Sequence, residues 1–314
     1  MPQTVKSSLT PNFTRQDYST FFLAGASCCT ITHGLMTPID IIKTRIQIDP
    51  ALKRNSMLTA GRKIVAAEGA AGLMTGFGPT AVGYLIQGGL KFAGYEYMKK
   101  RLVDLAGSPE AAVANRTTIY LVGASVSEFF ADIFLTPLEA TRIRLVSNPK
   151  YASGLVSGFT KLASTEGFSG LYSGFIPIVC KQVPYTIGQF TTNEFMHELA
   201  YKSMTKEEQE NLSTTKRLGI NLGSGITAGI VAAVLSHPAD TLLSQINKGD
   251  GPKGPMLGRL LTLGRQAGFA GLFAGLGPRM LMTAGLVAGQ FLIYSEIKDA
   301  LGAKPGIEIG KDAA

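Results

Sequence analysis

Titratable side chains interrupt the apolar stretches of this 314-residue sequence at a few places. Glu128 and Asp132 are four residues apart, so they share one face of a helix. His33 lies five residues before Pro38, as Asp132 lies five residues before Pro137. A carboxylate at membrane depth costs roughly 2.5–3.5 kcal/mol, so such groups should line a wet cavity. Histidine titrates near physiological pH. We expect these three side chains to carry protons; the alternative is that they pair with Lys or Arg.

Cations and amides form a second group, in the middle of three other apolar stretches. A small oxyanion suits such a set, because cations balance its charge and amides donate hydrogen bonds to its oxygens. No aromatic box or long apolar pocket for a nucleotide accompanies them. The alternative is that single members are structural or reach toward the membrane surface. The candidate substrate-binding residues are Gln87, Lys91, Lys181, Gln182, Gln189 and Gln290.

Charged residues also follow a proline in three places, at Pro38, Pro137 and Pro238. The acid and the base after each of the first two prolines are three residues apart, so each pair shares a helix face. Three such faces around an axis would form a ring of ion pairs that gates one end of a bundle. Leu243 stands where the third base belongs, and charges in a membrane interface are the alternative explanation. The expected gate residues are Asp40, Lys43, Glu139, Arg142 and Asp240.

The three proline segments belong to an internal repeat. The prolines are spaced by 99 and 101 residues, and a glycine motif recurs later in each unit, at Gly72, Gly170 and Gly271. A unit of about 100 residues is longer than a solenoid repeat, and it holds two long apolar stretches. We therefore expect two helices per repeat and one integral membrane domain. The expected repeats are 17–105, 116–203 and 214–302.

The apolar stretches have the length of membrane spans, since roughly 20 residues cross a bilayer as a helix. The sequence thus predicts an all-α membrane protein with six transmembrane helices. Each signature proline removes a backbone donor, so a kink is expected in each odd-numbered helix. The odd stretches are Thr20–Thr37, Ile119–Thr136 and Leu218–His237, and the even stretches are 77–98, 175–196 and 276–297.

The composition agrees with a membrane protein. Only 17% of the residues are charged, where soluble domains average about a quarter, and 45% are hydrophobic. A net charge of +8 fits an anionic membrane surface or an anionic substrate, and no basic run with interleaved aromatics points to nucleic acid. The three cysteines form no CxxC motif, which argues against a disulfide framework. Residues 1–17 lack the apolar core of a secretory signal and are a weak match to a transit peptide.

The proline segments resemble the signature of the mitochondrial carrier family, P-x-[DE]-x-x-[KR]-x-[KRQ]. The first segment matches it at Pro38, Asp40, Lys43 and Arg45, and the resemblance covers nearly the whole chain. It implies six helices in three pseudo-threefold repeats with short matrix helices. It also implies a mitochondrial inner-membrane carrier that alternates between a cytoplasm-open and a matrix-open state, with the proline-linked ring closing the matrix side.

The family has a second motif, [FY]-[DE]-x-x-[KR], near the end of each even-numbered helix, and it implies a gate on the cytoplasmic side. This sequence departs from that motif, because His197 and Ser295 stand at two of the charged positions. The remaining charges allow two pairs, Lys99 with Glu194 and Lys298 with Glu96. The expected cytoplasmic gate residues are Glu96, Lys99, Glu194 and Lys298.

Further residues are similar to the phosphate-carrier branch of this family, in particular to its fungal members. They include Thr32-His33, Ile86-Gln87-Gly-Gly-Leu-Lys91, Glu128-Phe-Phe-Ala-Asp132 and the unusual Leu243. The resemblance implies symport of inorganic phosphate with a proton into the matrix, which is equivalent to exchange of phosphate for hydroxide. It also places His33, Glu128 and Glu139 in the proton path.

Other functions are compatible with some of these residues. Cys29 and His33 are four residues apart, and thiolate with imidazole suits Cu(I), so copper or another small solute is the rival substrate. A membrane scaffold or receptor that does not transport is the rival from another class. No enzyme activity, metal or cofactor is expected, because the three histidines are scattered and no phosphate-binding glycine loop occurs. Cardiolipin is a candidate bound lipid, and the family resemblance suggests a monomer.

Overall fold

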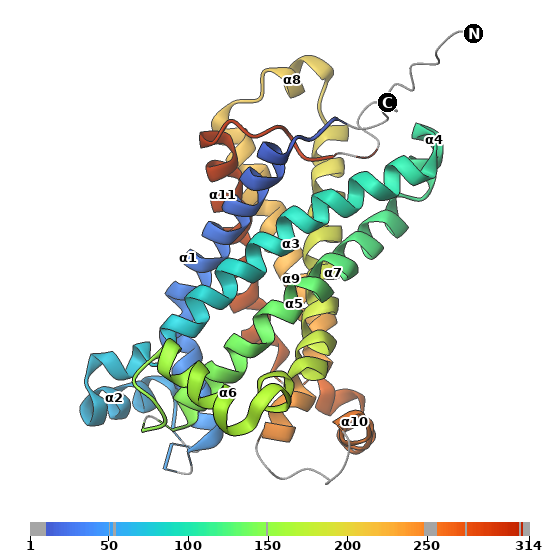
Figure 1. Ribbon diagram of the computed structural model, residues 1–314. Helices are drawn as coiled ribbons and strands as arrows, with labels where there is room; N and C mark the ends of the chain where they lie inside the picture. The colour runs from blue at the N-terminus through green and yellow to red at the C-terminus, as the bar shows by residue number, and fades with distance from the viewer. Residues whose placement is uncertain are drawn as a thin grey trace.

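The computed structural model describes residues 11–49, 51–52, 55–148, 150–247, 256–273, 275–307 and 309. Residues 1–10 of the N-terminal segment and residues 248–255 of the third repeat lie outside these ranges. The described chain is helical and contains no strand. Six long helices form the body of the molecule (Figure 1): α1 Arg15–Ile48, α3 Phe77–Ala106, α5 Arg116–Ser147, α7 Phe175–Lys202, α9 Thr214–Asn247 and α11 Leu276–Ala300.

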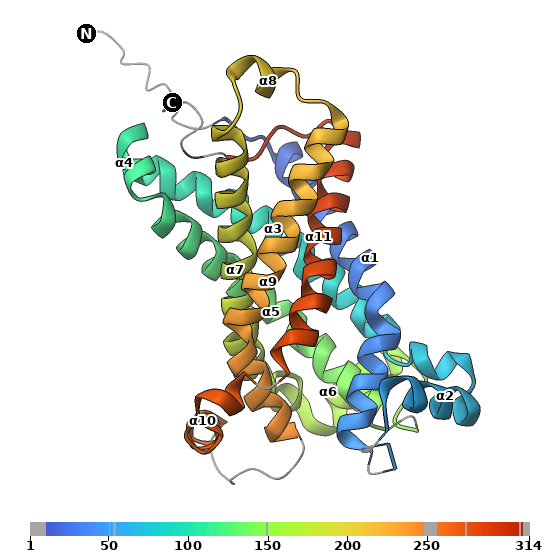
Figure 2. The ribbon, with the colours of Figure 1, turned by 180° about the vertical axis from the view of Figure 1, so that it is seen from behind.

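The long helices form a closed ring, because each packs against the next one along the chain and α11 returns to α1. One end of the ring, called the α6 end below, carries α2 Met57–Glu68, the 3₁₀ turn η1 Ala70–Met74, α6 Leu155–Tyr172 and α10 Met256–Leu272 (Figures 1 and 2). The other end, called the terminal end, carries α4 Pro109–Ala114, α8 Lys206–Glu210, the start of α1 and the end of α11.

The signature prolines lie inside continuous helices and do not end them. Helices α1, α5 and α9 therefore run on for nine or ten residues past each proline, beyond the apolar stretches of the sequence. A proline leaves the carbonyl four residues earlier without its helical donor. In α5 that carbonyl belongs to Ile133, and the Tyr172 hydroxyl donates a hydrogen bond to it at 3.1 Å. The chain thus compensates the lost bond of Pro137 from a neighbouring helix.

Small residues let neighbouring helices approach closely. A Cβ placed on Gly88 of α3 would lie 2.5 Å from the Cβ of Cys29 in α1, and one on Gly25 would lie 2.6 Å from the Gly88 carbonyl oxygen. Gly229 of α9 meets α11 in the same way, 2.6 Å from the Cα of Ala284. In lipid, where the hydrophobic effect does not drive helices together, such close contacts hold a bundle.

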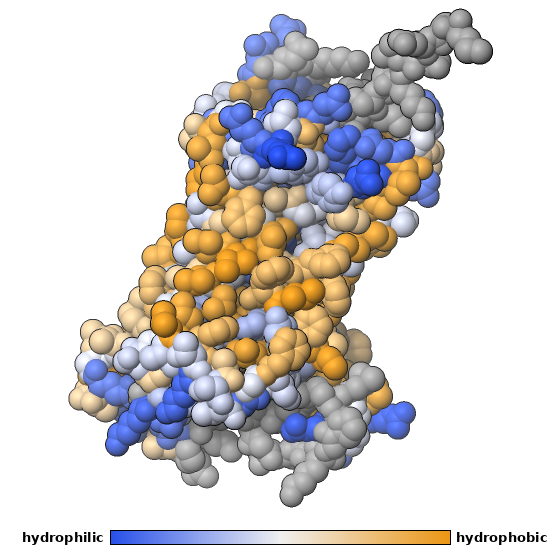
Figure 3. All heavy atoms as spheres, in the orientation of Figure 1, coloured by the Kyte–Doolittle hydropathy of each residue, from blue (hydrophilic) through white to orange (hydrophobic). Residues whose placement is uncertain are grey.

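The surface is banded, as expected of a chain that crosses a membrane. On the face shown in Figure 3, a hydrophobic belt lies between hydrophilic bands at the two ends. Among the described helices, α5, α9 and α11 are long and apolar enough to span a membrane by composition alone. The other long helices carry polar residues toward the interior, such as Lys91 of α3 and Lys181 of α7, which lowers their mean hydropathy.

Candidate functional site

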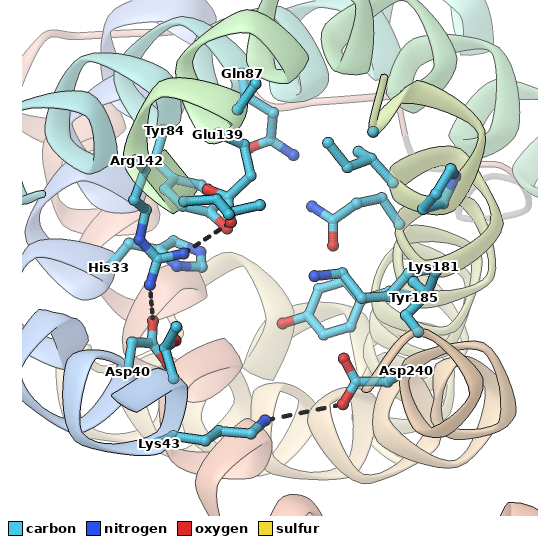
Figure 4. Close-up of a pocket in the computed structure, with 18 of the residues that line it drawn as sticks. His33, Asp40, Lys43, Tyr84, Gln87, Glu139, Arg142, Lys181, Tyr185 and Asp240 are labelled. Carbon is cyan, nitrogen blue, oxygen red and sulfur yellow. Dashed lines mark hydrogen bonds and ion pairs between the residues drawn. The ribbon is translucent and has the colours of Figure 1, made fainter. Parts of the chain in front are cut away.

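A cavity of about 590 Å³ lies inside the ring and reaches toward the α6 end (Figure 4). All six long helices contribute to its wall. Its volume is in the range of about 300–1,000 Å³ that is usual for small-molecule sites. Six of the ten predicted substrate-binding and proton-carrying residues line it: His33, Gln87, Lys91, Glu139, Lys181 and Gln182.

The lining is strongly cationic, with seven Lys and Arg side chains against three carboxylates. Two of the lysines line it from different repeats, Lys91 from α3 and Lys181 from α7. Among the described residues, no carboxylate lies within 4 Å of either ammonium group. The Lys91 ammonium is 2% exposed, donates to Gln189 Oε1 at 3.3 Å and lies 5.7–6.0 Å from the rings of Phe92, Tyr185 and Phe190. The cavity therefore has uncompensated positive charge for an anion.

Gln189 and Gln290, which the sequence placed in the substrate site, lie in a layer behind the cavity wall. Lys91 donates to Gln189, the Gln189 amide donates to Gln290 Oε1 at 2.8 Å, and the Gln290 amide donates to Cys29 Sγ at 3.6 Å. All three repeats contribute to this buried chain of hydrogen bonds. It holds Lys91 in place and separates the cavity from the terminal end.

The two carboxyl groups of α5 are fully buried behind the wall. Gln87 Nε2 and the Thr186 hydroxyl each donate to Glu128 at 2.6 Å, so its described partners are neutral. Both carboxyl oxygens of Asp132 lack a hydrogen-bond donor among the described residues. Gln87 both lines the cavity and donates the hydrogen bond to Glu128, so it connects the buried carboxyl group with the cavity.

His33 lines the cavity and stacks on Tyr84, with ring centroids 3.5 Å apart (Figure 4). Cys29, the other residue of the suggested copper pair, is fully buried and accepts the hydrogen bond from Gln290. The described residues contain no group of three His, Cys, Asp or Glu side chains arranged to hold a metal ion. The two residues thus belong to different layers of the bundle.

At the α6 end, the residues after the prolines form a loose ring of ion pairs. Arg142 of α5 lies 3.6 Å from Asp40 of α1, and Lys43 of α1 lies 3.8 Å from Asp240 of α9 (Figure 4). Glu139 pairs with Arg142 of its own helix at 2.8 Å. A link from α5 to α9 is missing from the described pairs, because Leu243 occupies the place of the third cation.

Arg279 of α11 is a cavity residue that the sequence reasoning missed. It pairs with Asp240 and donates to the Ser236 hydroxyl at 2.9 Å. The sequence does contain a signal for Arg279. It follows Pro278 and is charged, whereas the residues after the equivalent prolines of the other repeats, Thr80 and Ile178, are uncharged. A charge that breaks the threefold repetition at membrane depth is expected to serve the particular substrate or its gate.

The terminal end is closed by two further layers. Phe92, Phe190 and Phe291 hold equivalent places on α3, α7 and α11, and their ring centroids are 5.0–6.2 Å apart in all three pairs. Beyond them Lys99 pairs with Glu194 at 2.5 Å and with Glu96 at 3.0 Å. Lys298 lies 5.5 Å from the ring centroid of Tyr294, and its pairing with Glu96 stays a prediction.

Comparisons with known proteins agree with this geometry. A family model described as mitochondrial carrier protein matches residues 15–105, 114–204 and 214–305. The chain is 45% identical to mitochondrial substrate carrier family protein N of Dictyostelium discoideum, over 90% of this chain and 94% of that protein. It is 37% identical to mitochondrial phosphate carrier protein 2 of Arabidopsis thaliana (93% and 80%) and 36% identical to a probable mitochondrial phosphate carrier protein of Schizosaccharomyces pombe (92% and 93%).

Proposed function

This chain belongs to the mitochondrial carrier family, and we propose that it moves inorganic phosphate together with a proton into the mitochondrial matrix. It is a multi-pass protein of the mitochondrial inner membrane and a transporter, not an enzyme. The α6 end, with its short helices, is the matrix end. The phosphate and the proton are the two parts of the proposal that need support beyond the family.

The observation that carries the phosphate part is the pair of lysines without carboxylate partners, Lys91 and Lys181. Two ammonium groups on different helices balance the charge of a phosphate dianion, and the Gln87 and Gln182 amides supply neutral donors in the same cavity. The names of the Arabidopsis and Schizosaccharomyces relatives point to the same substrate. Phosphate would bind between Lys91 and Lys181 while one gate is open. It would dissociate from them after that gate has closed and the gate at the other end has opened.

The observation that supports proton coupling is the buried pair of carboxyl groups on α5. Glu128 and Asp132 have no cationic partner within hydrogen-bond distance among the described residues. An ionisable group at membrane depth is by default part of an ion or proton pathway. Gln87 connects Glu128 with the cavity, so a change in the charge of Glu128 is felt where phosphate binds. His33 and Glu139 also line the cavity and extend this path toward the matrix end.

The test is uptake of radiolabelled phosphate by proteoliposomes, with and without an inward proton gradient. Replacing a lysine that binds phosphate removes charge-assisted hydrogen bonds of about 1.5–3 kcal/mol, so Lys91→Ala and Lys181→Ala should each lower kcat/KM roughly 10- to 100-fold. Lys63→Ala, at an exposed position of α2, is the matched control and should transport normally.

A second comparison separates the proton from the phosphate. Glu128→Gln should abolish uptake driven by the proton gradient while exchange of internal for external phosphate continues, and the exposed Glu110→Gln serves as its control. If the folded wild-type protein takes up no phosphate, the proposal is wrong. Cu(I) uptake is then the next assay, and a chain that carries neither is a scaffold or receptor. The same preparations would show whether the monomer suffices and whether added cardiolipin changes the rate.

A further inference from the structure

The chain turns back over the terminal end of the bundle after its last helix. Gly302 adopts a left-handed backbone (φ 63°), and the Ala303 N–H donates to the Lys298 carbonyl at 3.0 Å, which ends α11 with a reversal. The following segment crosses the end of the bundle (Figures 1 and 2). We call its described residues, 303–307 and 309, the strap.

A single residue of the strap joins the ion network of the terminal end. The Ile307 N–H donates to Glu96 Oε2 at 3.0 Å, and Lys99 Nζ donates to the Ile307 carbonyl at 3.0 Å. The same two side chains pair with each other and, through Lys99, with Glu194. Ile307 therefore satisfies both the acid and the base of α3 at once, in the way that a bound peptide backbone does.

The strap is also held by apolar burial and at its near end by an ion pair. Ile307 and Ile309 are each 5% exposed and pack in one cluster with Tyr95 and Tyr120. Lys304 pairs with Asp17 of α1 at 3.1 Å and donates to the Asn12 carbonyl at 3.0 Å. The strap thus ties the end of repeat 3 to the beginning of repeat 1.

The strap forms one side of a hollow at the terminal end. A vestibule of about 140 Å³ lies at the terminal end, lined by Gly306 and Ile307 of the strap together with side chains of α3, α7, α9 and α11. A Cβ on Gly306 would lie 2.8 Å from Glu96 Oε1, so a larger residue there would displace the Glu96 carboxylate from its place beside the strap.

We propose that the helices around the vestibule form a binding site for an extended peptide segment with buried isoleucines, that the strap is its resident ligand, and that this end opens only when the strap leaves. Ile307 is bound by Glu96 and Lys99 of α3, and the strap begins at the end of α11, so α3 stays linked to α11 while the strap is bound. Lys99 in turn pairs with Glu194 of α7, so the bound strap supports the ion network that joins these helices. The proposal concerns the opening of the carrier and holds for any substrate, so it does not depend on phosphate being carried.

The test measures access to the vestibule and needs no transport. Ser295 lines the vestibule, so Ser295→Cys in the full chain can be labelled by a charged methanethiosulfonate reagent added from the terminal side. Ile307→Pro removes the N–H that binds Glu96 and keeps an apolar side chain. With one charge-assisted hydrogen bond lost, labelling should be roughly 10- to 100-fold faster. Gly306→Ala should have the same effect through its clash with Glu96, whereas Gly219→Ala, at an open position of α9, should have none.

A free peptide with the sequence of residues 303–309 completes the test. In excess it should return the Ile307→Pro variant to slow labelling, while the same peptide with serine in place of both isoleucines should not. Cys28 and Cys29 are fully buried, so their labelling reports any unfolding of a variant. Labelling of folded Ile307→Pro and Gly306→Ala at the unaltered rate, or no protection by the peptide, overturns the proposal. Either result leaves the phosphate assay untouched.

Discussion

The two ends of the bundle are closed by the same kind of interaction in very different surroundings. At the terminal end, Lys99 and its two carboxylates are 2–15% exposed and 2.5–3.0 Å apart. At the α6 end, the two pairs of the proline-linked ring that join helices, Arg142–Asp40 and Lys43–Asp240, are 3.6 and 3.8 Å long, and the Lys43 side chain is 45% exposed. Between the cavity and the terminal end lie the hydrogen-bonded amides of Gln189 and Gln290 and the three packed phenylalanines, and the strap covers them. The α6 end borders the cavity directly.

The difference shows that burial, rather than the number of charges, sets how firmly each end is held. A pair in a dry interior is attracted strongly, and removing one partner leaves an uncompensated buried charge. A pair in contact with solvent is screened and contributes little. The structure therefore corresponds to a state that is firmly closed at the terminal end and loosely linked at the matrix end. Each prediction below changes one end in a way that should leave the other unaffected.

The largest effect is expected from Lys99→Met, which leaves Glu194 and Glu96 buried without their shared cation. Breaking a buried pair in this way costs about 3–5 kcal/mol, so the apparent Tm in detergent should fall by roughly 6–20 °C. The control is Lys100→Met. Lys100 follows Lys99 in the sequence but pairs with a partly exposed carboxylate, Asp104, on the outer surface. Thermal unfolding of the purified protein measures both.

Two outcomes would bear on the comparison of the ends. If Lys99→Met were as stable as Lys100→Met, burial would not distinguish the terminal end from the surface. Adding Glu194→Gln to Lys99→Met should recover part of the lost stability, because it removes one of the stranded charges. No recovery would mean that Lys99 acts mainly through Ile307 of the strap.

The sequence predicted much of what the two ends share. The repeat gave six helices, and counting from the prolines placed His33, Gln87, Lys91, Lys181 and Gln182 around one cavity. This works because residues at equal places in the three repeats reach equal depth in a symmetric bundle. The Lys99–Glu194 pair was predicted in the same way, from the threefold motif.

The features that distinguish the two ends could not be predicted from the sequence. Equal depth does not reveal whether a side chain faces the cavity or a neighbouring helix, so Gln189 and Gln290 were assigned to the substrate and lie in the layer behind it. The strap depends on a contact between Ile307 and Glu96, which are far apart in the chain and have no repeated counterpart. In α5 the hydrogen bond lost at Pro137 is compensated by Tyr172 of α6, a contact between helices that the sequence does not show.

A smaller effect, in the opposite direction, is expected from strengthening the α6 end. Leu243→Arg would give Glu139 the partner on α9 that the ring lacks, while the long side chain keeps part of the packing against Leu260 and Leu263. A pair of about 1 kcal/mol would raise the apparent Tm by roughly 2–4 °C and slow exchange about fivefold. Leu243→Met keeps the packing without the charge and should do neither. Faster exchange by Leu243→Arg would mean that the missing link does not loosen this end.

Removing the Lys43–Asp240 pair from the α6 end should change the stability of the protein only slightly. Lys43→Ala deletes a cation that is half in solvent, and Asp240 keeps Arg279 as its partner. The expected cost is below about 1 kcal/mol, hence a fall in apparent Tm of no more than about 4 °C. The decisive measurement is the ratio of this fall to that of Lys99→Met in the same detergent. A ratio near one would contradict the view that the two ends are held unequally.

The smallest effect is expected at the outer rim of the α6 end, where Arg144 donates two hydrogen bonds to Glu166 of α6 at 3.0 and 2.6 Å. These bonds hold the pKa of the Glu166 carboxyl below its usual value. The stability they give is therefore complete above about pH 4.3, the pKa of an unfolded glutamate, and is lost as the pH falls through the lower folded pKa. Both side chains are more than a third exposed, so solvent screening limits the effect to a few tenths of a kcal/mol. Glu166→Gln should lower the apparent Tm slightly at neutral pH and by less in acid. A difference that grows toward acid would show that Glu166 is not stabilised by Arg144.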